Sequence, residues 1–293
     1  MTTYLQPALS GHQLTVDAAL KSPTTLARQI GRLVDRDLLL PRFCHQLGAP
    51  VTGGGMVYST ITADNLYVAT VEQRQPGDEY PSTTGELPEP RLALVEDWGA
   101  KFRVPHEDRT RNNVSLLDQQ TRQLANTLVR KLDERLLAKL GDVIGGDQTV
   151  PGHDWDQVLT VGPADSLTPS AGLPTADLAL AQLVADRSEL GVRLDTLIVH
   201  PDQAAALRIA YAEKLAGMLT SAGVNLVVNP RLTAGTAWVI EAGKVGTVGF
   251  EYPLTVDVWE DKPTRSTVVQ AFVVPAIAVD RPECSVRLTG LAA

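Results

Sequence analysis

Cysteine, aromatic residues and excess positive charge are all scarce in this 293-residue sequence. Its two cysteines, Cys44 and Cys284, lie far apart and form no CxxC motif, which favours two free thiols in a reducing compartment over a disulfide or a metal site. The net charge is −8, so no overall basic field would attract nucleic acid. Hydrophobic residues still make up 44% of the chain, enough for a globular protein with a buried core.

A long hydrophobic run is also missing. The longest apolar stretch, near residues 272–279, is interrupted by Pro275 and is too short to span a bilayer. The first basic residue is Lys21, so residues 1–20 lack the charged start of a signal peptide. We therefore expect no membrane partner.

Common catalytic motifs are absent as well. The sequence contains no GxSxG elbow and no HExxH, and the glycines Gly243, Gly246 and Gly249 around Lys244 lack the order of a phosphate-binding loop. The remaining polar candidates lie in a loop or at expected helix starts: His153, Asp154 and Asp156; His106, Glu107 and Asp108; and His200 before Pro201. The first group is expected to be solvated, the second to favour a helix N-terminus, and His200 to end a strand and cap a helix. We expect no catalytic residue, cofactor or metal.

Two stretches have the periodicity of helices. Residues 22–40 begin with Ser22 and Pro23, a good cap and first-turn pair, and should end where Pro41 forbids continuation. The strongest pattern covers about residues 113–144, with Asn112 or Asn113 as the cap. Its apolar face is formed by leucines, and charges occupy the other faces: Leu117, Leu124, Leu128, Leu132, Leu136 and Leu140 against Arg122, Arg130, Lys131, Asp133 and Glu134. A helix of this length is expected to act as a strut.

Residues 72–90, EQRQPGDEYPSTTGELPEP, fit neither a central strand nor an amphipathic helix, because they carry six charges and four prolines. Alternating stretches, residues 56–72 and 91–108, flank this segment and predict a projecting hairpin whose loop exceeds the usual two to five residues. After residue 175 the pattern becomes α/β, followed by β segments to the end. The segment is either disordered or ordered by a neighbour.

This order of parts resembles the major capsid proteins of tailed bacteriophages, which have the Hong Kong 97-like fold. The local sequences that carry the resemblance are WGAKFRVPHED before the long helix, DTLIVHPDQAAALRIA, FEYPLTVDVWED and FVVPAIAVDRPECSVRLTG. The resemblance implies an α+β fold with an N-terminal arm at 1–50 and an extended loop at 51–104. It also implies a peripheral domain with a spine helix at 105–152 and 255–282, and an axial domain at 153–254 and 283–293.

The resemblance further implies a structural role in a virion: many copies associate as pentamers and hexamers around packaged double-stranded DNA, without sequence-specific binding. The extended loop would lie on a neighbouring copy, and the residues expected to make that contact are Glu72, Arg74, Asp78, Glu79, Tyr80, Glu86 and Arg91. No lysine occurs between Lys21 and Lys101, so a covalent link through the loop is not expected.

Only about 50 residues precede the hairpin, so a fused scaffolding segment is not expected. The resemblance instead implies a separate scaffolding protein, a portal and a decoration protein as partners, with assembly in the bacterial cytoplasm. Two alternatives remain open. One is an encapsulin-type compartment of the same fold, and the other is a cytosolic α/β enzyme with an inserted hairpin, which would show a pocket of perturbed titratable groups.

Overall fold

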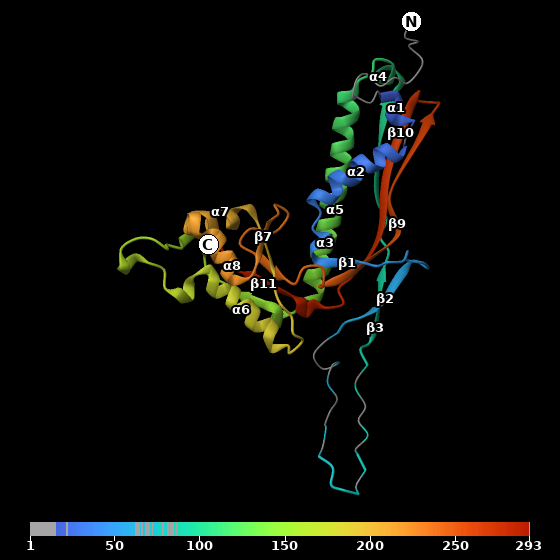
Figure 1. Ribbon diagram of the computed structural model, residues 1–293. Coiled ribbons are helices and arrows are strands. Elements are labelled where there is room, and N and C mark those ends of the chain that lie inside the picture. Colours follow the sequence, from blue (N-terminus) through green and yellow to red (C-terminus); the bar gives the residue numbers. More distant parts are fainter. Residues whose placement is uncertain are drawn as a thin grey trace.

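The computed structural model describes residues 16–21, 23–61, 65, 67, 71, 73–77, 79–80, 82, 85 and 87–292 (Figure 1). A long helix stands beside a tall sheet, an α/β lobe lies to one side, and the described residues between β2 (Gly55–Ser59) and β3 (Pro90–Leu94) extend away from both. The model is therefore mixed α+β, as predicted.

The described residues of the N-terminal region, from Val16 onward, pack against the rest of the protein, including the long helix. It comprises α1 (Val16–Leu20), α2 (Pro23–Asp37), α3 (Leu40–Phe43) and β1 (Cys44–Gln46). The predicted helix over 22–40 is confirmed as α2, but Pro41 does not end it. Pro41 instead occupies the first turn of α3, a position where its missing N–H costs nothing.

The predicted strut is α5 (Val114–Val143), a helix of 30 residues. The Asn113 side chain caps it by accepting a hydrogen bond from Leu116 N, and all six leucines of the predicted apolar face are buried. Asp133 was expected on a polar face, and this was wrong, because it is fully buried. Its carboxylate accepts hydrogen bonds from Leu39 N at 2.9 Å and from Arg231 at 2.8 Å, so it joins the arm, α5 and the loop after β7.

The tall sheet has the order β1-β9-β10-β4 and packs against α5 and α2. Its main strands are β4 (Trp98–Pro105), β9 (Gly246–Asp261) and β10 (Ser266–Ala278). The continuous strand predicted over 91–108 is in fact two strands, since β3 pairs with β2 whereas β4 pairs with β10. A register shift in β10 between Phe272 and Pro275 bends the sheet where the two strands part.

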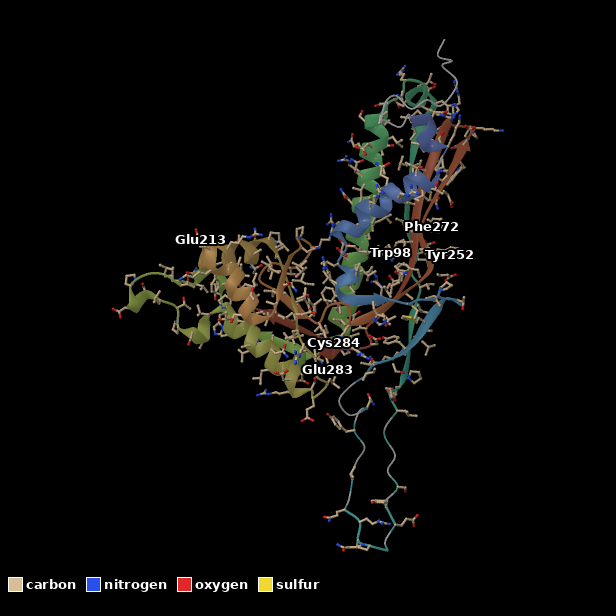
Figure 2. All side chains as sticks on the ribbon, in the orientation of Figure 1. Trp98, Glu213, Tyr252, Phe272, Glu283 and Cys284 are labelled. Atoms are coloured by element: carbon tan, nitrogen blue, oxygen red, sulfur yellow. The ribbon has the colours of Figure 1, made fainter. Side chains whose placement is uncertain are left out.

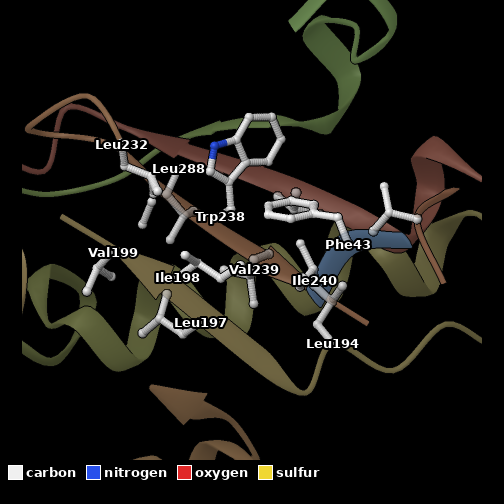
Figure 3. Packing of buried hydrophobic residues seen from close by; sticks show 14 of the residues in the cluster. Phe43, Leu194, Leu197, Ile198, Val199, Leu232, Trp238, Val239, Ile240 and Leu288 are labelled. Carbon is white, nitrogen blue, oxygen red and sulfur yellow. The ribbon is translucent and has the colours of Figure 1, made fainter. Parts of the chain in front are cut away.

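The α/β lobe contains a five-stranded sheet with the order β5-β11-β8-β6-β7. Its strands are β5 (Thr149–Pro151), β6 (Thr196–Val199), β7 (Asn225–Val228), β8 (Ala237–Ile240) and β11 (Ser285–Thr289), and its helices are α6 (Pro174–Arg187), α7 (Pro201–Tyr211) and α8 (Leu215–Ala222). Figure 3 shows the core of this lobe, where Phe43 from α3 packs edge-on against Trp238 at 6.0 Å. The arm therefore completes the core of a sheet formed some 190 residues later.

Short helices complete the chain. They are α4 (His106–Thr110), η2 (Gly146–Gln148), η3 (Trp155–Gln157), η4 (Ala164–Ser166), η5 (Ser170–Gly172), η6 (Ala212–Lys214) and η7 (Pro282–Cys284). Within the described ranges, no helix has the length and hydropathy needed to cross a membrane.

Candidate subunit contact surface

The β2–β3 ribbon exposes an apolar face to solvent. Val57 lies directly opposite Leu92, with Leu94 two residues further along β3 on the same face. These side chains are 70%, 59% and 61% exposed, whereas Ala93, which points the other way, is 4% exposed. We call Val57, Leu92 and Leu94 the outer ribbon face. In this strand the large apolar residues face outward and the small one faces the protein.

The base of the ribbon is attached firmly to α5. Glu96, just after β3, accepts hydrogen bonds from Arg135 Nε at 2.7 Å and from Trp98 Nε1 at 3.2 Å, and Lys139 Nζ lies 3.8 Å from its carboxylate. The hydrogen bond from Arg135 holds the pKa of Glu96 below its usual range. The carboxylate therefore stays ionised at neutral pH and keeps its ion pair with Arg135.

The predicted contact residues lie beyond and along this ribbon. The Arg74 guanidinium stacks over the ring of the exposed Tyr80 at 4.8 Å, a cation–π contact that ties the two sides of the loop together. Glu79 is exposed, and Arg91 is exposed on β3 opposite Tyr58. Glu72, Asp78 and Glu86 lie outside the described residues. A role of these residues between subunits stays a prediction.

The sequence analysis did not predict the outer ribbon face, although the alternation of large and small apolar residues in β3 was visible. Leu92 and Leu94 alternate with the much smaller Ala93, and the larger members of such a pair normally face the core. A second apolar feature lies nearby, where β9 and β10 bend: the rings of Tyr252 and Phe272 are 6.1 Å apart, and Tyr252 is exposed (Figure 2). Both features lie where a neighbouring molecule could cover them.

Polar residues of the loop after β5 have hydrogen-bond partners within the protein. His153 Nδ1 lies 2.7 Å from the fully buried Asp177, which also accepts a hydrogen bond from Trp155 Nε1 at 2.8 Å. Asp154 caps η3 by accepting a hydrogen bond from Asp156 N at 3.0 Å. Within the described part of the chain, no group of three or more His, Cys, Asp or Glu side chains is placed to hold a metal ion.

The glycines near Lys244 serve strand packing. A Cβ at Gly246 would lie 2.3 Å from Ala278 O, and one at Gly249 would lie 2.4 Å from Val51 Cγ2. Glycine is required there because β9 approaches its neighbours so closely, and this confirms the strand-and-turn interpretation.

The histidines at expected helix starts lie where the sequence predicted. The His200 side chain caps α7 by accepting a hydrogen bond from Asp202 N at 3.3 Å. His106, Glu107 and Asp108 form the first turn of α4, with both acids at its N-terminus.

An apolar cavity of about 250 Å³ lies between the arm, α5 and β9. Side chains such as Leu128, Leu132 and Leu254 line it, together with Cys44. Burial raises the pKa of the Cys44 thiol to about 12, and burial likewise raises that of Cys284 to about 11, so both stay protonated at neutral pH. A neutral thiol among leucines is a packing element, and this cavity has no convergent catalytic groups.

Solved structures match this fold over most of its length. A virus-like particle from Pyrococcus furiosus superposes with a TM-score of 0.61 at 14% identity, covering 90% of this chain and 98% of that one. The capsid of cyanophage P-SCSP1u gives 0.57 at 13% identity, covering 100% and 93%. The capsid of Myoviridae phage XM1 gives 0.54 at 14% identity, covering 85% and 90%. The predicted Hong Kong 97-like fold is thereby confirmed.

The sequence itself also matches a family model. No curated protein matches the chain. The model of the family described as phage capsid protein matches residues 88–288, which run from β3 through α5 and the α/β lobe into β11. This is well over half of the chain. The protein belongs to the phage capsid protein family.

Proposed function

We propose that the chain is the major capsid protein of a tailed bacteriophage and that its copies associate as pentamers and hexamers into an icosahedral head around packaged double-stranded DNA. Membership of a capsid family supports a structural shell role over that of an α/β enzyme. The observation that carries the proposal is the outer ribbon face, because Val57, Leu92 and Leu94 are left in water by a single chain. A second copy covering this face would remove apolar surface from water, at roughly 25 cal/mol per Å².

The loop beyond the ribbon adds polar contacts to this apolar one. Glu72, Arg74, Asp78, Glu79, Tyr80, Glu86 and Arg91 are proposed to lie on the neighbouring copy. An exposed ion pair is worth only about 0–1 kcal/mol, so these residues select the partner and the register more than they supply affinity. The ribbon base, held on α5 by Glu96 and Arg135, would transmit each contact to the body.

We assign to the subunit the domains that the resemblance to the family implies. The arm comprises residues 1–50, the extended loop 51–104, the peripheral domain 105–152 and 255–282, and the axial domain 153–254 and 283–293. Two clusters of buried apolar residues match part of this division: one joins α2, the first half of α5 and β10, and the other surrounds the five-stranded sheet and also includes Leu136 and Leu140 of α5. The strand β9 runs through both clusters.

The proposed partners follow from the shell. A separate scaffolding protein would guide curvature, a portal would occupy one vertex, and a decoration protein would bind the outside, with assembly in the bacterial cytoplasm. The net charge of −8 suits a wall that encloses DNA without gripping it, and binding to DNA would be independent of sequence.

An encapsulin-type compartment is the second candidate. It is favoured by one observation, the match to a structure described as a virus-like particle, which has a higher TM-score than the two phage capsids above. In that case the shell would close around a protein cargo without a scaffolding partner.

Negative-stain microscopy of the purified chain separates the two candidates. Expressed alone, a phage capsid protein should give aggregates, free capsomers or shells of mixed size, and co-expression with a scaffolding protein should restore one diameter. Uniform small shells holding a host protein would favour the encapsulin instead. A chain that stays monomeric with and without the partner would refute both. Shells boiled with reductant should run as one band near 31.5 kDa, since the loop has no lysine for a covalent link.

A further inference from the structure

The apolar cavity beside Cys44 lies between the two clusters of buried apolar residues in the subunit. It has a volume of about 250 Å³ and takes its walls from the arm, α5, β9 and β10. Of the residues that line it, Val34 and Leu128 belong to the cluster around α2 and α5, whereas Leu40 and Val248 belong to the cluster around the five-stranded sheet. Figure 1 shows α3 and β1 beside the lower part of α5, with β1 running toward β9. The cavity is therefore a space left where the two cores meet.

An irregularity in the tall sheet accounts for one wall of this space. The pairing of β9 with β10 shifts in register between Phe272 and Pro275. Pro253, on the facing strand, has no N–H to donate to the ladder. Pro253, Leu254 and Val273 all line the cavity. Because a bulge bends its strand and turns the neighbouring side chains, the sheet does not close fully onto α5 at this point.

The opposite wall is held in place by hydrogen bonds outside the cavity. Leu39 N, in the link between α2 and α3, donates to Asp133 of α5 at 2.9 Å. The strand β1 pairs in parallel with β9, and this pairing is extended by Leu47 N, which donates to Val248 O at 2.8 Å. These bonds fix the backbone of the arm on both sides of the space. The cavity is thus a feature of the backbone arrangement, and a change of one side-chain rotamer would not remove it.

The lining determines which kind of ligand the cavity could hold. Among the described residues, no Asp, Glu, His, Lys or Arg lines it, and its polar side chains are Cys44 and Gln46. A charged ligand would lose its hydration there without gaining a partner. Apolar cavities of about 150 Å³ stay dry and bind benzene, so a cavity of this size suits an uncharged apolar molecule of about ten non-hydrogen atoms.

The size of the cavity also excludes a protein segment as its occupant. Its deep wall is closed, since Leu40, Cys44 and Leu132 are only 2%, 3% and 3% exposed. Its exposed lining residues include Pro41 and Pro253. An α-helix with its side chains is about 10 Å across, which is too wide for a space of this volume. A small molecule can enter where a second copy of the chain cannot.

We propose that this cavity is a binding site for a small uncharged hydrocarbon-like molecule, an alkylbenzene or an alkyl chain of about ten carbon atoms. The bound molecule contacts Val34 of α2, Leu132 of α5 and Leu254 of β9 at the same time. It supplies the dispersion contacts that an empty space denies to these side chains. Binding therefore joins the two cores and holds the arm against α5 and β9. The site belongs to a single subunit and does not depend on how copies associate.

Isothermal titration calorimetry of the purified chain with ethylbenzene tests the site. One molecule should bind per subunit, and the melting temperature should rise by about 2 °C or more when free ethylbenzene reaches ten times its Kd. Phenylacetate is of similar size but charged, and it should neither bind nor shift the melting temperature, because its carboxylate would have no partner in the cavity. These two probes test the wild-type chain without any substitution.

Variants that fill the cavity locate the binding. Leu254→Trp and Val34→Phe each place a larger ring in the space, and each should weaken ethylbenzene binding by about tenfold or more without lowering the melting temperature. Leu183→Trp is the matched control, since it adds the same ring at an exposed position on α6 and should bind ethylbenzene as the wild type does.

Three results would overturn the inference. The first is a wild-type chain that takes up no ethylbenzene, and the second is one that binds phenylacetate equally well. The third is a folded Leu254→Trp or Val34→Phe variant that binds ethylbenzene with unchanged affinity, because the ligand would then lie elsewhere. None of these results bears on whether the copies form a shell, which microscopy tests separately.

Discussion

The strands β3 and β8 are both short and rich in apolar residues, but within one chain only β8 is fully buried. β8 lies between β11 and β6, and all four of its residues, Ala237–Ile240, are buried. β3 pairs with β2 in a two-stranded ribbon, where Leu92 and Leu94 are exposed and Ala93 is buried. The environment of β8 is complete within the subunit, whereas the outer ribbon face is left in water by a single chain and would be covered in the proposed shell. Changes in the body should therefore affect folding, and changes in the ribbon should affect assembly.

The largest effect is expected in the body, from Leu128→Asp. Leu128 is buried on α5 against the arm and the tall sheet, so the new carboxylate would have no partner and would cost several kcal/mol of unfolding free energy. Soluble yield and thermal melting should both fall sharply. The exposed neighbour Thr127→Asp should leave both unchanged. Soluble Leu128→Asp subunits that assemble normally would contradict the core role of this helix face.

Charged substitutions at two adjacent residues of the ribbon should affect different properties, assembly at Leu92 and subunit stability at Ala93. Leu92→Asp places a charge on the outer ribbon face, so the subunit should keep its melting temperature but lose shells in sedimentation and negative stain. Ala93→Asp points toward the body and should lower stability by several kcal/mol. If Leu92→Asp subunits assembled like the wild type, the outer ribbon face would not be a contact between copies.

This contrast also shows how far the sequence predicts the structure. The leucines of α5 and the cap at His200 were predicted correctly, because helical periodicity and cap chemistry are local. Asp133 was placed on a polar face because its partner Arg231 lies 98 positions away and leaves no local trace. The strand predicted over 91–108 split in two because the partners of β3 and β4 belong to different sheets.

The contact surface was harder to predict for the same reason. Charge and proline content indicated residues 72–91 as the contact surface, and the residues of the outer ribbon face lie outside this range. Alternation between large and small apolar residues predicts a strand, but it does not say which face meets the body. That choice depends on contacts between residues far apart in the sequence, and the hydrogen bond of Arg135 to Glu96 at the ribbon base, across 39 positions, is one of them.

The buried carboxyl of Asp133 should make the stability of the subunit depend on pH, independently of assembly. Burial raises the pKa of Asp133 to about 6, although Leu39 N and Arg231 offset part of that effect. The folded state thus binds this proton more tightly than the unfolded state, and the contribution of Asp133 to stability is lost as pH rises from about 4 toward about 6.

Asp133→Asn should remove this dependence. Between pH 4.5 and pH 7, the difference in unfolding free energy between wild type and variant should change by about 2 kcal/mol, with the wild type relatively more stable at the acidic end. Chemical denaturation at the two pH values measures it. A difference independent of pH would show that Asp133 is ionised throughout. Asp17 and Glu96 have lowered pKa values, so their effects fall at more acidic pH.

The smallest effect is expected at the tip of the loop, from Arg74→Ala. The stacking of Arg74 on Tyr80 is exposed, and such cation–π contacts are worth about 0.5–1 kcal/mol. Losing it would leave the loop less well ordered for its neighbour, so the concentration needed for assembly should rise by no more than about fivefold, with the melting temperature unchanged. Light scattering over a concentration series measures this, and Arg28→Ala, which removes an exposed arginine from α2, is the control. A complete loss of shells would show that the loop tip, and not the outer ribbon face, contributes most of the free energy of assembly.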